Sequence, residues 1–87
     1  MKIKNGFSKC KVGDGYLVVT TGELSRTNSI MIELNETSSD IWDLIEKGYD
    51  EERIADKLVK KYSVDKETAL SDVRGLIAKM TDAGIFA

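Results

Sequence analysis

The first part of the chain carries apolar and polar side chains at the two-residue period of β-strands. Residues 7–12 alternate loosely, and residues 16–21 are dense in β-branched and aromatic side chains. Between them, Gly13-Asp14-Gly15 supplies a turn that can adopt positive φ. The pattern therefore predicts a β-hairpin.

The third predicted strand follows a polar stretch. A bend is predicted at residues 25–28, and residues 29–34 then alternate so that Ile30, Ile32 and Leu34 fall on one face. Three short strands are therefore expected to precede all the helices.

The corner after the third strand has the features of a helix N-terminus. Asn35 can accept a hydrogen bond from the backbone N–H of Thr37 or Ser38, and Glu36 places a negative charge at the positive end of the helix dipole. The first helix is predicted over residues 36–47, and the glycine that follows closes it.

Two further helices follow at the 3.6-residue period. Asp50 is the predicted cap of the second helix, and the chain turns at Ser63. Asp65 caps the third and longest helix, predicted over residues 66–82. A short apolar tail is then expected to fold back on the core.

The order of these elements indicates an α+β domain. A strand group followed by three helices, the last two joined by a short turn, is typical of folds related to the winged helix-turn-helix. We therefore predict a three-stranded antiparallel sheet followed by three helices. With 87 residues the chain has room for a single domain, spanning residues 1–87.

The composition excludes most kinds of catalytic site. Histidine is absent and Cys10 is the only cysteine, so no Ser-His or Cys-His pair, histidine metal site or disulfide can form within the chain. We predict no enzyme activity, no catalytic residue, no metal site and no cofactor. Cys10 lies in an alternating segment, where a small buried hydrophobe is expected rather than a reactive thiol.

The hydropathy pattern contains no membrane segment. No apolar run approaches the roughly 18 residues that a membrane span needs. Residues 1–5 also lack the apolar core of a signal peptide. A cytoplasmic location without a membrane partner is therefore expected.

The residue pattern at the strand-to-helix corner is similar to that of a known protein family. The run Leu34-Asn35-Glu36-Thr37, followed by Ile41-Trp42, resembles the PqqD family. Its members are small peptide chaperones, also called recognition elements of ribosomally synthesised, modified peptides (RiPPs). Matching positions continue in the same order over nearly the whole chain: Val18-Val19, Gly22, Gly48-Tyr49, Glu51-Glu52-Arg53-Ile54, Leu58, Tyr62, Val64, Asp72-Val73, Leu76 and Ala83-Gly84-Ile85.

The resemblance implies a non-catalytic carrier of a precursor peptide. In the family, the leader segment of the precursor adds as an extra strand beside the third strand and packs against the third helix. A radical S-adenosylmethionine enzyme, or another peptide-modifying enzyme, is the implied second partner. By position, the implied peptide-binding residues are Asn28, Ser29, Ile30, Met31, Ile32, Glu33 and Leu34 on the strand, and Lys66, Leu70, Val73, Arg74 and Ile77 on the helix.

Two apolar stripes run along the third predicted helix, one more than a single core seam requires. The second stripe either widens the core or forms one wall of a groove, whose other wall would be an unpaired edge of the third strand. Its two cations could steer acidic leader residues, although a solvated face is the commoner role. The first stripe comprises Ala69, Val73, Leu76 and Met80, and the second comprises Leu70 and Ile77 with Lys66 and Arg74.

Two single residues have competing interpretations. Trp42, the only tryptophan, is expected in the core because it follows Ile41 within the inward stripe of its helix, and stacking on a ligand or partner is the alternative. Asp72 fits either a partner interface or a hydrogen bond to a neighbouring turn.

Other classes of function remain open at this point. The order of the last two helices would suit nucleic-acid binding, but the net charge of −2 and the pI of about 5.1 disfavour it. A general protein-interaction domain is a further alternative, and an unpaired sheet edge would also suit a homodimer. The residues select neither the precursor nor the product. The second helix carries a basic run with the spacing of a solvated face: Arg53, Lys57, Lys60 and Lys61.

Overall fold

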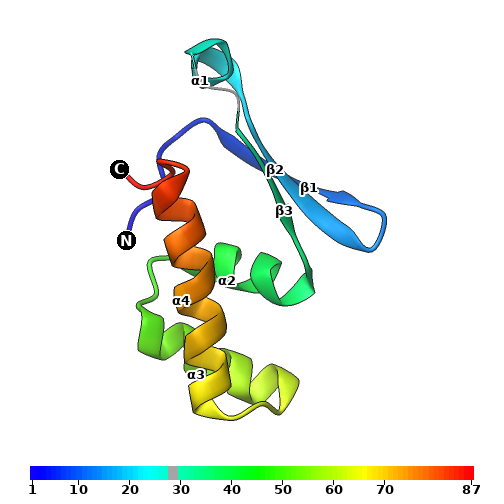
Figure 1. The fold of residues 1–87 in the computed structure, drawn as a ribbon, viewed down its shortest axis with the longest axis vertical. Helices are drawn as coiled ribbons and strands as arrows, with labels where there is room; N and C mark the ends of the chain where they lie inside the picture. Colours follow the sequence, from blue (N-terminus) through cyan, green and yellow to red (C-terminus); the bar gives the residue numbers. More distant parts are fainter. Residues whose placement is uncertain (28–29) are drawn as a thin grey trace.

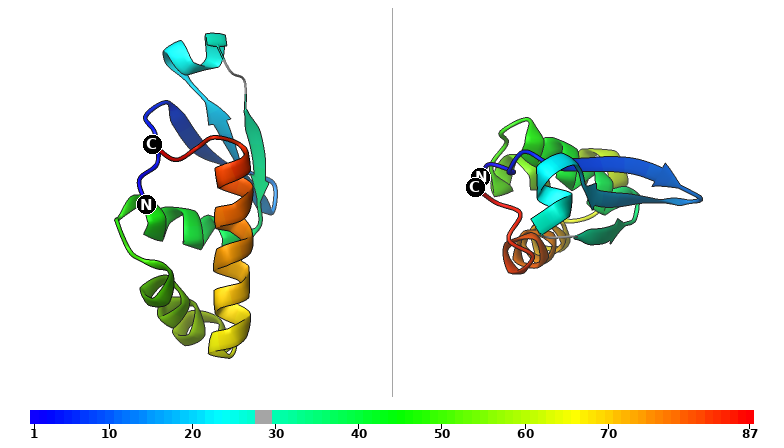
Figure 2. Two further views of the ribbon diagram at one scale, coloured as in Figure 1. Left: turned by 60° about the vertical axis from the view of Figure 1, so that its left-hand side comes forward. Right: turned by 90° about the horizontal axis from the view of Figure 1, so that it is seen from above.

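The computed structural model describes residues 1–27 and 30–87 (Figure 1). Its sheet lies at one end of the long C-terminal helix, and two shorter helices pack along the remainder (Figures 1 and 2). The predicted α+β architecture, with a three-stranded antiparallel sheet followed by three helices, is confirmed. In chain order, the described elements are β1 (Phe7–Val12), β2 (Gly15–Thr20), α1 (Gly22–Thr27), β3 (Met31–Leu34), α2 (Glu36–Glu46), α3 (Glu51–Tyr62) and α4 (Lys66–Asp82).

The sheet has the order β1-β2-β3, and both pairs are antiparallel. The hairpin turn is made by Gly13, whose φ of 58° favours glycine. Gly15 is needed for a different reason: a Cβ at this position would lie 3.0 Å from the carbonyl oxygen of Leu34 on β3. The predicted hairpin is confirmed, and its second strand passes close to the third.

The segment between β2 and β3 differs from the prediction. A short helix, α1, forms where a polar bend was expected, so the strands do not all precede the helices. Gly22 turns the chain at φ 59°, and the Ser25 hydroxyl donates a hydrogen bond to the Gly22 carbonyl at 2.7 Å. β3 begins at Met31, two residues later than predicted. Asn28 and Ser29, both predicted to bind peptide, lie outside the described residues.

The core lies where the sheet meets the helices. Ile32 and Leu34 of β3 are buried, and Ile30 is half-buried against them, as the alternating pattern predicted. Trp42 is 2% exposed, and the Phe7 ring from β1 meets it edge to face at a centroid distance of 6.3 Å. The core interpretation of Trp42 is therefore confirmed.

The predicted caps of the three longer helices are all present. The side chains of Asn35, Asp50 and Asp65 accept hydrogen bonds from the backbone N–H three residues further on, at 2.8, 2.8 and 2.7 Å. Helix α3 ends at Ser63, which adopts the left-handed conformation at φ 55°. Because these caps are local features of the sequence, the observed helix boundaries agree closely with the predicted ones.

The two ends of the chain lie together (Figures 1 and 2). Ile3 pairs with Phe86 in an antiparallel bridge, and the backbone N–H of Lys4 donates to the carbonyl of Ile85 at 2.9 Å. Ile85 is fully buried, so the apolar tail folds back on the core as predicted.

The prediction for Cys10 was wrong, because its side chain is exposed. Phe7 and Lys9 occupy the half-buried positions of β1, and Cys10 lies on the opposite face. Hydropathy alone predicts that the cysteine is buried and the lysine exposed. The opposite is found here, because the Lys9 ammonium has polar partners on α2.

Candidate functional site

One edge of β3 is open. β2 pairs with β3 on one side, and in the described part of the chain no strand pairs with the other. Both views in Figure 2 place β3 as the strand closest to α4, so the open edge lies on the α4 side of the sheet. The expectation that the outer edge of the third strand is unpaired is met. An edge of this kind can accept an extended chain by main-chain hydrogen bonding.

The register shows which backbone groups the open edge presents. The N–H of Thr20 donates to the carbonyl of Ile30 at 3.3 Å, and hydrogen-bonded pairs alternate along an antiparallel ladder. The N–H and C=O groups of Ile32 therefore also point toward β2. Those of Met31 and Glu33 point outward. Among the described residues of the predicted peptide-binding strand, Met31 and Glu33 are therefore the ones that present backbone groups at the open edge.

A cavity of about 270 Å³ lies where β3 ends, between the first turn of α2 and the middle of α4. Most of its lining residues are polar, and the apolar one is Leu76. Among its lining residues are Thr37 and Ser38 from α2, and Asp72, Gly75, Leu76 and Lys79 from α4. The first stripe of α4 is buried as predicted, and Leu76 is the member of that stripe that reaches this cavity.

The predicted cations of α4 lie elsewhere. Lys66 makes ion pairs with Glu52 at 3.0 Å and with Asp56 at 2.6 Å, and both carboxylates belong to α3. The Arg74 guanidinium lies 3.3 Å from Glu51, also on α3. These residues therefore face α3. The cavity at the end of β3 lies on another face of α4.

The remaining predicted residues of α4 are not on the cavity side either. Leu70 and Ile77 are half-buried against the core, and helical spacing places them on the same side of α4 as Lys66 and Arg74. Val73 is fully buried, so its side chain is not available to a ligand. The predicted peptide-binding residues of α4 therefore do not line the cavity at the end of β3.

The ion pairs of Lys66 also change its electrostatic role. Hydrogen bonds to Asp56 and then Glu52 raise the pKa of the Lys66 ammonium above its ordinary value. Exposed pairs of this kind contribute little to stability, but they compensate the charge that was expected to attract acidic leader residues.

The sequence did contain signals for the cavity side. Asp72 stood out without a defined role, and Gly75 interrupts a long helix. Nothing local indicates which face of α4 meets β3.

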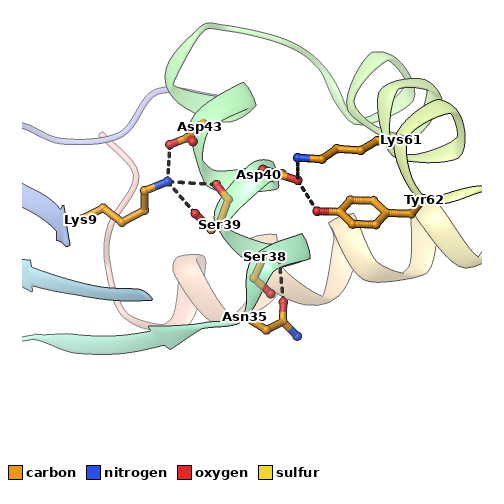
Figure 3. Close-up of polar contacts among 8 residues, drawn as sticks. All are labelled: Lys9, Asn35, Ser38, Ser39, Asp40, Asp43, Lys61 and Tyr62. Carbon is orange, nitrogen blue, oxygen red and sulfur yellow. Dashed lines mark hydrogen bonds and ion pairs between the residues drawn. The ribbon is translucent and has the colours of Figure 1, made fainter. Parts of the chain in front are cut away.

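A polar clamp holds the sheet to α2 (Figure 3). The Lys9 ammonium donates to the Ser39 hydroxyl and to the Asp43 carboxylate, both at 2.6 Å. The Lys9 side chain is only 17% exposed, and its ammonium lies 5.0 Å from the centre of the Tyr16 ring. This clamp fixes the sheet relative to the helix whose first turn lines the cavity.

A second polar cluster joins α2 to α3 (Figure 3). Asp40 accepts hydrogen bonds from Lys61, at 2.8 Å, and from the Tyr62 hydroxyl. Burial raises the pKa of the Asp40 carboxyl, but the hydrogen bonds from Lys61 and Tyr62 outweigh it, so the pKa lies below its ordinary value. Burial, followed by the bond to Asp40, raises the pKa of Tyr62.

The Asp40 cluster predicts an acid-dependent loss of stability. The pKa of Asp40 is lower in the folded chain than its value of 3.8 in the unfolded chain. The ionised carboxylate therefore stabilises the fold at pH values above 3.8, and this contribution is lost as the pH falls through the pKa of the folded state. Asp40→Asn should lower the free energy of unfolding by about 1 kcal/mol at neutral pH. The difference from the wild type should shrink as the pH falls below 3.8 and through the lower pKa of the folded state.

Urea unfolding of both proteins across this pH range measures the effect. Asp14→Asn, in the exposed hairpin turn, serves as the control and should follow the wild type throughout. A constant gap between Asp40→Asn and the wild type at every pH would contradict the assigned role of the carboxylate.

The basic run on α3 is partly engaged within the domain. Arg53 and Lys57 lie over the Tyr49 ring, at 4.5 and 5.1 Å from its centre, and Lys61 binds Asp40. Three of its four cations therefore have partners on the domain itself, which weakens the nucleic-acid alternative.

The described residues contain no group of three potential ligands that could hold a metal ion. Within the same residues, no helix is both long and apolar enough to cross a membrane.

Two solved structures share this fold over almost the whole chain. One, described as TbiB1 in complex with the TbiA(beta) leader peptide, is 25% identical, with a TM-score of 0.77 over 98% of this chain and 93% of that one. The other, described as lasso peptide synthetase B1 complexed with the leader peptide, is 19% identical, with a TM-score of 0.78 over 97% of this chain and 93% of that one. No curated protein sequence matches the chain.

A small α+β domain with an open strand edge beside a long helix is suited to bind an extended peptide. The family model of coenzyme PQQ synthesis protein D (PqqD) matches residues 23–85. The chain therefore belongs to the PqqD family, whose members are non-catalytic peptide chaperones. The recognition made from the strand-to-helix corner is confirmed.

Proposed function

We propose that this chain binds the leader segment of a ribosomally synthesised precursor peptide and presents the rest of that peptide to a modifying enzyme. The open edge of β3 beside α4 is the observation that carries the proposal. A protein that is similar over 98% of this chain was solved with a leader peptide, which supports the same role here.

Strand addition to β3 supplies the main-chain part of the affinity. The outward N–H and C=O groups of Met31 and Glu33 match the spacing of an incoming extended chain. Each such hydrogen bond contributes about 0.5–1.5 kcal/mol without requiring a particular side chain. Selectivity then comes from the α4 side chains beside the edge, above all Asp72, Leu76 and Lys79.

Presentation works through effective concentration. Once the leader is held, the core of the precursor meets an associated enzyme in an intramolecular encounter, so modest leader affinity suffices. This role requires no cofactor on the chain itself. The family resemblance favours a radical S-adenosylmethionine enzyme as the partner that carries out the chemistry.

NMR titration of the isotope-labelled chain tests the proposal. The probe is a synthetic leader peptide of the precursor encoded beside its gene, and a scrambled peptide of the same composition is the control. We expect saturable amide shifts along residues 30–34 and 72–79, with no response to the scrambled peptide. Shifts centred on Leu70 and Arg74 would instead favour the α3 side of α4. No shifts at near-millimolar leader would count against peptide capture.

A further inference from the structure

We propose that the cavity between α2 and α4 is a side-chain pocket for a carboxamide, glutamine or asparagine, of the bound peptide, and that Gly75 keeps it open. The inference rests on the proposed function, because it concerns the selectivity of the same peptide site. Three observations carry it: the unexplained glycine, the charged side chains of Asp72 and Lys79 on either side of it, which pair with no other described residue, and the position of the cavity at the end of β3.

Nothing among residues 1–27 and 30–87 requires glycine at position 75. It lies inside the 17-residue helix α4, where glycine is the poorest helix former after proline. Its φ is not in the left-handed region, so the backbone conformation does not call for it. A Cβ there would meet no atom within 4 Å, so internal packing does not exclude a side chain either. The free space at Gly75 therefore serves something outside the chain.

The polar groups around Gly75 indicate the ligand chemistry. Asp72 and Lys79 lie about one helical turn before and after it. Across the described residues, neither side chain has a hydrogen bond or an ion pair. They are seven positions apart, which separates their Cα atoms by about 10.5 Å along the axis and leaves both side chains free to turn toward a group above Gly75.

A carboxamide satisfies both charges at once. Its NH₂ group donates to the Asp72 carboxylate, and its carbonyl oxygen accepts from the Lys79 ammonium. A carboxylate ligand would be repelled by Asp72, and an ammonium or guanidinium ligand would be repelled by Lys79. The methylene groups of a glutamine can rest on Leu76, which is apolar and lies at the base of the cavity.

The location of the cavity fits a residue of an added strand. β3 ends at Leu34, and the cavity begins at the first turn of α2 immediately after it. The hydroxyl groups of Thr37 and Ser38 line the same space and have no hydrogen bond among the described residues. A peptide paired along β3 that extends past this end would therefore bring one side chain over Gly75.

A matched pair of leucine variants tests the role of Gly75. Gly75→Leu fills the cavity, whereas Ala78→Leu adds bulk on another exposed face of the same helix. The probe is the synthetic leader peptide, and its affinity is measured by fluorescence anisotropy. We expect Gly75→Leu to weaken binding by at least roughly tenfold and Ala78→Leu to change it less than about twofold. Melting temperatures of Gly75→Leu and Gly75→Ala should not fall below that of the wild type, because each replaces an exposed glycine by a better helix former, and that of Ala78→Leu should stay close to the wild type.

A peptide scan tests the chemistry. Each position of the leader is replaced in turn by Gln, Glu, Lys and Ala. We expect one position at which Gln binds at least roughly tenfold more tightly than Glu or Lys, and we expect this preference to disappear in Gly75→Leu. The absence of such a position, or equal leader affinity of Gly75→Leu and the wild type, would overturn the pocket and leave leader capture intact. Failure of the wild type to bind any leader peptide would overturn the proposed function and the pocket together.

Discussion

A Glu33→Pro variant should fold normally and lose most of its affinity for a leader peptide. The N–H of Glu33 points to the open edge of β3, away from β2, so proline removes no hydrogen bond from the sheet. An incoming strand would lose one donor and leave its own carbonyl unpaired against the proline ring. Together these effects should weaken binding by about 2–4 kcal/mol.

Glu33→Ala is the matched control, because it removes the same side chain and keeps the N–H. Its leader affinity, measured by calorimetry beside that of the proline variant, should stay close to the wild type. Circular dichroism and melting temperature establish that both variants are folded. Equal affinities of the proline and alanine variants would show that the leader does not pair with this edge.

Trp42→Ala should strongly destabilise the domain. The indole is 2% exposed and packs edge to face on Phe7, so its removal leaves a large cavity between the sheet and α2. Truncation of a buried aromatic residue costs about 3–5 kcal/mol. A domain of 87 residues has a total stability of only about 4–13 kcal/mol, so much of the variant is expected to be unfolded at 37 °C.

Trp42→Phe keeps an aromatic ring against Phe7 and should lose far less stability. Urea unfolding followed by circular dichroism compares the three proteins, because fluorescence would lose its only tryptophan. If Trp42→Ala retained wild-type stability and lost leader binding, the indole would belong to the ligand site and not to the core.

The fold followed from local patterns to a large extent. The two-residue alternation predicted Ile32 and Leu34 as buried, and the cap side chains Asn35, Asp50 and Asp65 set the helix starts. Helix α1 was missed, because a segment of six residues is too short to show helical periodicity and its turn is stabilised by a local hydrogen bond. The exposed position of Cys10 was missed because it depends on the distant partners of Lys9.

The candidate site was predicted only in part. The open edge of β3 followed from the number and order of strands. The α4 residues did not, because Leu70 and Asp72 lie on opposite flanks of one buried stripe and either flank could have faced β3. The pairs of Lys66 and Arg74 with α3 show which flank turned away.

The sequence by itself determined the elements, their caps, the buried stripes and the PqqD family, because these depend on residues close together in the chain or on a recognisable ordered set. Only the tertiary structure decided which flank of α4 stands beside β3, that Val73 is sealed in the core, and that Gly75 opens into a cavity. The rotation of a helix about its axis is set by contacts between segments far apart in the chain, and no local pattern records it.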